Sequence, residues 1–121
     1  DLAQDLFQQD RLNPENPELL DFWHPELLRA VASATQAAKS VGIEVGVCGD
    51  AASDPIMAVV LAGMGVDKVS SAVSVIEEIH LALCSVTMDE AKSLASLALE
   101  SPDRLSARKA VGDAFRAIAI R

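Results

Sequence analysis

A switch from strand-like to helix-like sequence within residues 45–55 constrains the fold of this chain more than any other feature. Val45 and Val47 are β-branched and are separated by a glycine, a pattern typical of a half-buried strand. Asp54 and Pro55 favour a helix start, because a carboxylate caps the first turn and proline lacks an N–H that has no partner there. The segment therefore predicts a strand, a short loop of small residues and a helix, as in an α/β domain.

Cys48 lies in that loop region, and the residues alone leave two interpretations open. The carboxyl end of a strand is where α/β sheets and barrels place their chemistry. Gly49 and the small residues after it would let a ligand approach the backbone closely. The alternative is that Cys48 is a small buried hydrophobe, which is common for an isolated cysteine near an apolar strand.

Apolar spacing and turn residues predict a mostly helical α/β chain with two parallel strands. His24 precedes the first helix at a capping position, a role that requires no catalytic function. Two parallel strands cannot bury both of their faces alone, so we expect residues 1–121 to be part of a larger domain. The expected elements are helices over residues 25–41, 55–64, 88–99 and 101–118, and strands over residues 43–48 and 66–71.

Capping residues predict where two of the helices begin. Ser74 and Glu77 match the capping-box pattern, for a helix that ends near Cys84. Thr87 and Glu90 repeat the pattern before the helix at 88–99. From its place near the end of its helix, we expect Cys84 to fill space in the core.

Charge and composition exclude several classes of function. The net charge is −8, so no basic surface could neutralise nucleic-acid phosphates. No apolar run is long enough to span a bilayer and no signal peptide opens the chain, so membrane insertion is not expected. The chain contains two cysteines, too few and too far apart for a disulfide framework or a metal knuckle. A reducing cytoplasm is therefore the expected location.

Several motifs together point to a known family. They are Val47-Cys-Gly-Asp-Ala-Ala-Ser-Asp-Pro55, Leu61-Ala-Gly-Met-Gly-Val-Asp67 and Val69-Ser-Ser-Ala-Val-Ser74, with Asp1-Leu-Ala-Gln4, Asp10-Arg11 and His24-Pro-Glu-Leu-Leu-Arg29 before them. This set resembles the C-terminal phosphoenolpyruvate (PEP)-binding barrel of Enzyme I, the PEP–protein phosphotransferase of the bacterial sugar phosphotransferase system. The resemblance implies that residues 1–121 are the C-terminal portion of a TIM-type (β/α)8 barrel.

The resemblance also implies roles for individual residues. Cys48 matches the family's general acid, which protonates the methylene carbon of the enolate when PEP gives up its phosphoryl group. A thiol suits that role because it holds its proton at neutral pH. Arg11 matches a substrate-binding arginine, whose guanidinium fork fits carboxylate or phosphate. Asp1 matches a residue that binds substrate and the catalytic Mg²⁺. Gly49 matches a position where the backbone approaches the ligand.

The partners implied by the resemblance are PEP and pyruvate, the carrier protein HPr through an N-terminal domain that precedes these residues, and a second copy in a homodimer. Neither His24 nor His80 matches the family's phosphorylated histidine. Two alternatives stay open. The chain could be a non-catalytic dimerisation module, or a fragment of a related pyruvate phosphate dikinase or PEP synthase, which share the Cys-Gly segment.

Overall fold

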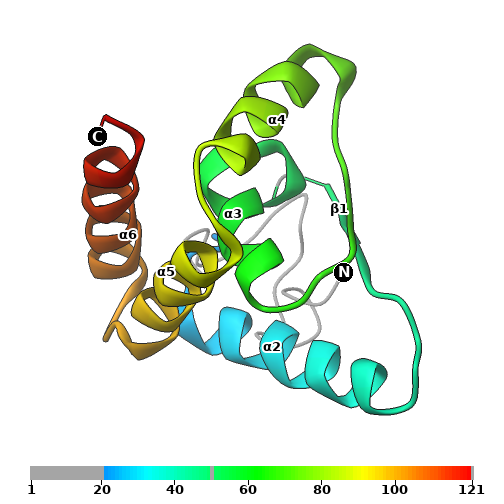
Figure 1. Ribbon diagram of the computed structural model, residues 1–121. Coiled ribbons are helices and arrows are strands. Elements are labelled where there is room, and N and C mark those ends of the chain that lie inside the picture. Colours follow the sequence, from blue (N-terminus) through cyan, green and yellow to red (C-terminus); the bar gives the residue numbers. More distant parts are fainter. Residues whose placement is uncertain (1–20, 50, 121) are drawn as a thin grey trace, which may run out of the picture.

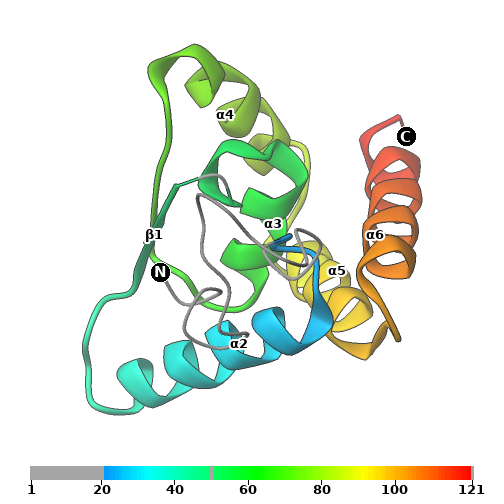
Figure 2. The same ribbon diagram turned by 180° about the vertical axis from the view of Figure 1, so that it is seen from behind.

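The computed structural model describes residues 21–49 and 51–120, shown from two sides in Figures 1 and 2. The described chain is mostly helical, with a two-stranded parallel sheet, which confirms the α/β expectation. Closure of a barrel, and the place of residues 1–121 at its C-terminal end, stay predictions. The α-helices are α2 (Pro25–Ser40), α3 (Pro55–Gly63), α4 (Ile76–Cys84), α5 (Met88–Glu100) and α6 (Arg104–Ala119); the strands are β1 (Gly46–Cys48) and β2 (Lys68–Ser70), and two 3-10 turns are η2 (Ala51–Ser53) and η3 (Val73–Val75).

Both strands are shorter than predicted, because the ends of the preceding helices use the backbone groups that a longer strand would need. The N–H of Ile43 donates to the carbonyl of Ala38, and the N–H of Val66 donates to the carbonyl of Leu61. In each case a glycine with positive φ precedes the donor, at 75° for Gly42 and 100° for Gly65. These are Schellman motifs, and they delay both strands by several residues.

Helix α3 forms the centre of the core (Figure 1). Its residues Met57, Ala58, Val59, Val60 and Leu61 are all completely buried. Helices α4 and α5 pack against α3, and α2 and α6 pack against α5. On the sheet, Val47 and Val69 lie opposite each other and pack against the core. Ile56 is partly buried, and α3 is therefore covered on more sides than an amphipathic stripe requires.

The predicted helix starts have mixed outcomes. The capping box of Thr87 and Glu90 is confirmed, with both of its hydrogen bonds formed at 3.1 and 2.8 Å. The box predicted for Ser74 and Glu77 is wrong, because Ser74 lies inside η3 and the N-cap of α4 is Val75 without a side-chain bond. The 3-10 turn tightens the chain just before the helix and moves its start past Ser74.

Two further corrections concern the C-terminal half. Helix α6 begins at Arg104 rather than at residue 101, because Asp103 accepts a 2.7 Å hydrogen bond from the N–H of Ser106 and is the N-cap. Cys84, expected in the core, is exposed at the end of α4. Its sulfur lies 3.6 Å from Nε2 of His80, one helical turn earlier.

The contact between α3 and α5 is close enough to require a glycine. A Cβ atom added to Gly63 would overlap the backbone carbonyl of Ala91 on α5. We expect Gly63→Ala to lower the free energy of unfolding by about 1–3 kcal/mol, because backbone must move to admit the methyl group. Gly46→Ala is the control, since its Cβ would lie 3.8 Å from the Cβ of Lys68, an ordinary contact. Urea unfolding measures both; equal stability of the two variants would contradict the prediction.

Asp67 joins the end of α2 to the start of the sheet. One carboxylate oxygen accepts a 2.7 Å bond from Nζ of Lys39, and the other accepts a 2.9 Å bond from the N–H of Val45. The backbone N–H of Asp67 also donates to the carbonyl of Val45, at 2.9 Å. The hydrogen bond from Lys39, followed by that from Val45, lowers the pKa of Asp67 from its usual range.

This lowered pKa makes the contribution of Asp67 to stability depend on pH. An unfolded Asp has a pKa of about 3.9. The ionised, hydrogen-bonded carboxylate therefore stabilises the fold fully above that pH, and its contribution is lost as pH falls through the lower folded pKa. We expect Asp67→Asn to be less stable than wild type at pH 7, with the difference shrinking between pH 4 and pH 2. Thermal unfolding at several pH values measures this.

Glu44→Gln provides the matched control. Glu44 forms a 3.0 Å ion pair with Lys68, and both side chains are more than two-thirds exposed, so its loss should change stability little at any pH. An Asp67→Asn variant whose deficit is the same at pH 3 and pH 7 would contradict the prediction.

Candidate functional site

Cys48 ends β1 and its thiol is exposed. Side chains alternate across a strand, so the residues on either side of Val47 lie on the sheet face turned away from the core. Ser70 is the residue opposite Cys48 in the parallel register and is exposed as well. The interpretation of Cys48 as a small buried hydrophobe is therefore wrong. The thiol is accessible at the carboxyl ends of both strands, where parallel sheets place their chemistry.

The backbone beside the thiol is exposed and has an uncommon conformation. Gly49 has a φ of 90°, which residues with a side chain rarely adopt. Among the described residues, no atom lies within 4 Å of the place where a Cβ on Gly49 would be. The carbonyl of Gly49 accepts hydrogen bonds from the N–H of Ala52, at 3.1 Å, and from the hydroxyl of Ser53, at 3.4 Å. The approach of a ligand to the backbone of Gly49, which the resemblance implies, stays a prediction.

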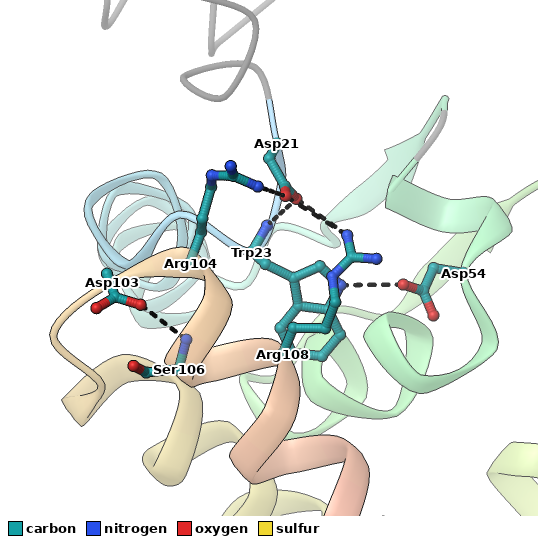
Figure 3. Close-up of polar contacts among 7 residues, drawn as sticks. All are labelled: Asp21, Trp23, Asp54, Asp103, Arg104, Ser106 and Arg108. Carbon is teal, nitrogen blue, oxygen red and sulfur yellow. Dashed lines mark hydrogen bonds and ion pairs between the residues drawn. The ribbon is translucent and has the colours of Figure 1, made fainter.

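Asp54 connects this turn to α3 and to a tryptophan far away in sequence. Its Oδ1 accepts from the N–H groups of Ile56, at 3.0 Å, and Met57, at 3.3 Å, which confirms the predicted cap. Its Oδ2 accepts a 3.0 Å hydrogen bond from the indole Nε1 of Trp23 (Figure 3). Sequence analysis missed Trp23. The one signal was that it is the single tryptophan, whose N–H needs an acceptor when the ring is buried.

Trp23 is itself held by charged residues (Figure 3). The carboxylate of Asp21 accepts from the backbone N–H of Trp23 at 3.0 Å, from Nη1 of Arg104 at 3.1 Å and from Nη2 of Arg108 at 3.3 Å. The guanidinium of Arg108 also lies 5.9 Å from the centre of the indole ring, within cation–π range. A pocket of about 230 Å³ lies beside Trp23 and is lined by Asp21, Phe22, Trp23, Ala51, Asp54, Met57 and Arg108.

The structure tests only some of the predicted site residues. Cys48 and Gly49 are adjacent in the open turn after β1, whereas Asp1 and Arg11 lie outside the described residues. Residues 21–49 and 51–120 contain no group of three or more His, Cys, Asp or Glu side chains able to hold a metal ion. The expected Mg²⁺ therefore depends on Asp1 and stays a prediction.

The two histidines of the chain lie at the start of one helix and on the surface of another. Nδ1 of His24 accepts a 3.3 Å bond from the N–H of Glu26, which confirms that His24 caps α2. His80 is exposed on α4, as expected. Within the part of the chain that the structure describes, no helix combines the length and apolar character needed to cross a bilayer.

Comparison with known proteins assigns the family. Residues 1–88 match the family model "PEP-utilising enzyme, PEP-binding domain". The chain is 37% identical over 110 residues to phosphoenolpyruvate-protein phosphotransferase of Streptomyces coelicolor, which covers 91% of this chain and 20% of the relative. It is 30% identical over 116 residues to the protein of that name from Mycoplasma genitalium, covering 96% and 20%.

A relative of a second kind is phosphoenolpyruvate synthase of Pyrococcus furiosus, 37% identical over 71 residues, which is 59% of this chain and 9% of the relative. The chain thus spans a fifth or less of the length of these three relatives. The family match covers most of the chain, including the Cys48 turn and both strands. This chain therefore belongs to the PEP-binding domain family of PEP-utilising enzymes.

Proposed function

We propose that this chain is part of the catalytic domain of a PEP–protein phosphotransferase, with Cys48 as the proton donor. The observation that carries the proposal is the exposed thiol at the carboxyl end of β1, next to the unobstructed backbone of Gly49. Family membership supports PEP as the ligand, and two relatives at 30% and 37% identity are named as phosphotransferases.

In the proposed reaction, the bond between phosphorus and the enol oxygen of PEP breaks, and the phosphoryl group passes to a histidine nitrogen. The remaining enolate takes the proton of the Cys48 thiol on its methylene carbon, which forms the new C–H bond of pyruvate. The thiolate then recovers a proton from solvent. Because neither histidine of this chain matches the phosphorylated position, that histidine and the onward transfer to HPr belong to the longer protein.

Arg11, Asp1 and Mg²⁺ complete the proposal. The guanidinium of Arg11 would bind a carboxylate or phosphate of the substrate through its fork of N–H donors. The Asp1 carboxylate would contact the substrate and help hold Mg²⁺, an ion that prefers carboxylate and phosphate oxygens. When bound, Mg²⁺ offsets the negative charge of the phosphate. A cytoplasmic location belongs to the same proposal, in keeping with the two free cysteines.

Replacement of Cys48 tests the proposal in the complete protein. We expect Cys48→Ala to slow pyruvate release from PEP by about 10²–10⁴-fold, the range typical of a lost general acid. PEP binding, measured by calorimetry, should persist, because the thiol acts on the enolate rather than on the bound substrate. Cys84→Ala removes the other exposed thiol and should leave the rate unchanged. Wild-type pyruvate release by Cys48→Ala would contradict the proposal.

A second candidate, an assembly module that forms a homodimer, is favoured by exposed apolar surface. Among the described residues, eight large apolar side chains are at least half exposed: Val41, Ile43, Val73, Ile76, Leu81, Met88, Leu105 and Ile120. Exposed apolar side chains that gather into one continuous patch are typical of surfaces that contact another chain. The two candidates are compatible, since one domain can do both.

Sedimentation of the complete protein at several concentrations measures the second candidate directly. We expect the weight-average mass to rise to twice the chain mass, because self-association follows mass action. A mass that stays monomeric up to high micromolar concentration would contradict dimerisation. Transfer of the phosphoryl group to HPr distinguishes a phosphotransferase from a dikinase or synthase, which differ in the acceptor.

A further inference from the structure

The two oxygens of the Asp54 carboxylate accept from different donors: one from the indole of Trp23 and the other from the first turn of α3. The Trp23 side chain is 3% exposed, so its N–H needs a partner inside the protein, and Oδ2 of Asp54 provides it at 3.0 Å. That bond leaves Oδ1 free to cap α3 through the N–H of Ile56. The tryptophan therefore sets the orientation of the carboxylate at the start of the buried helix.

Backbone hydrogen bonds link Asp54 to the described residues of the turn that follows Cys48. The N–H of Asp54 donates to the carbonyl of Ala51, at 3.4 Å, and the N–H of Ala52 donates to the carbonyl of Gly49, at 3.1 Å. Ala51 and Ala52 are 3% and 0% exposed, so both are packed into the core. A displacement of Asp54 would therefore be passed through this turn to Gly49 and to the direction of the Cys48 thiol.

Helix α6 supplies the support on the other side of Trp23. Arg104, one-third exposed, lies 3.1 Å from Asp21, and Arg108 reaches both Asp21 and the face of the indole (Figure 3). Asp21 in turn accepts the backbone N–H of Trp23. Both arginines lie beyond residues 1–88, the part that matches the family model. The support thus comes from a helix outside the matched region.

We propose that Trp23 is a positioning residue for Cys48, acting through its hydrogen bond to Asp54, and that Asp21, Arg104 and Arg108 hold Trp23 in place. This inference rests on the proposed function, because it assumes that the direction of the Cys48 thiol matters for proton transfer. A displacement of about 1 Å at a reacting group is enough to lower a rate about 10²-fold.

Trp23→Phe in the complete protein is the first test, because phenylalanine keeps an aromatic ring and removes the N–H donor. We expect kcat for pyruvate release to fall about tenfold or more, while KM for PEP changes less than threefold. Amide hydrogen exchange in the peptide that contains residues 49–57 should become faster. The alkylation rate of the Cys48 peptide by iodoacetamide, followed by mass spectrometry, should change in the same variant.

Asp54→Asn is a second variant, needed because Trp23→Phe also replaces the indole with a smaller ring. Asp54→Asn leaves Trp23 unchanged. An asparagine that keeps its oxygen on the N–H groups of α3 turns its NH2 group toward the indole N–H, so the hydrogen bond from Trp23 is lost while the cap is kept. We expect the same kcat loss, and no further loss in the double variant with Trp23→Phe, because both changes remove one bond. Arg116→Gln is the control on α6, since Arg116 pairs with Asp113 on its own helix at 2.9 Å, and it should match wild type.

The outcomes separate this inference from the proposed function. If Cys48→Ala retains pyruvate release, the proposed function fails, and exchange and alkylation still decide whether Trp23 fixes the Cys48 turn. If Trp23→Phe and Asp54→Asn leave kcat, exchange and alkylation at wild-type values, the inference is overturned. Where Cys48→Ala abolishes pyruvate release, an additive double variant, or faster exchange without a loss of kcat, also overturns the inference.

Discussion

The complete burial of α3 is the constraint on which the rest of this structure depends. Five consecutive residues, 57–61, are removed from water, and each large apolar side chain among them contributes about 1.5–3 kcal/mol when buried. A helix buried all round needs cover in every direction, unlike a surface helix with one apolar stripe. The two valines of the sheet cover one side, and α4 and α5 cover others. Gly63 allows the backbone of α5 to come close enough for this.

Because α3 is fixed so firmly, the turn that precedes it is fixed as well. Asp54 caps the helix, and Ala51 and Ala52 are packed against the core, so the last rigid point before the site lies only a few residues from Cys48. The turn then reverses direction at Gly49, where φ is positive. An exposed thiol thus lies a few residues before a buried helix, next to a turn whose described residues are hydrogen-bonded. That arrangement combines access for a ligand with a defined direction of the side chain.

Local signals predicted much of this fold and of the candidate site. Asp54 with Pro55, and Thr87 with Glu90, each act within a few residues, and both predictions were confirmed. Interactions that span the chain could not be predicted in this way. Trp23 and Asp54 are 31 residues apart, and Arg108 and Asp21 are 87 residues apart. No periodicity links such pairs, because only tertiary packing brings them together.

The wrong predictions also rest on local sequence signals, which neighbouring structure overrides. Ser74 matches a capping box in sequence, but the 3-10 turn at 73–75 determines where α4 begins. The strands were predicted too long because β-branched residues at their starts are used by helix-ending hydrogen bonds instead. The exposure of Cys48 was left open, since an apolar strand says which residues alternate but not which face is covered. The family resemblance favours an accessible Cys48, and the structure confirms that Cys48 is exposed.

The surface that presents Cys48 is also the surface that a parallel sheet normally covers. Parallel sheets are generally buried on both faces, yet here one face packs on α3 and the other carries the exposed residues 46, 48, 68 and 70. If Cys48 acts as proposed, any chain that covers this face has to leave space above the thiol. Gly46 and Ser70 are small, so they leave that space, whereas two large apolar residues would favour complete closure. Under the proposed function, these small residues favour a face that is enclosed around a ligand rather than filled by side chains.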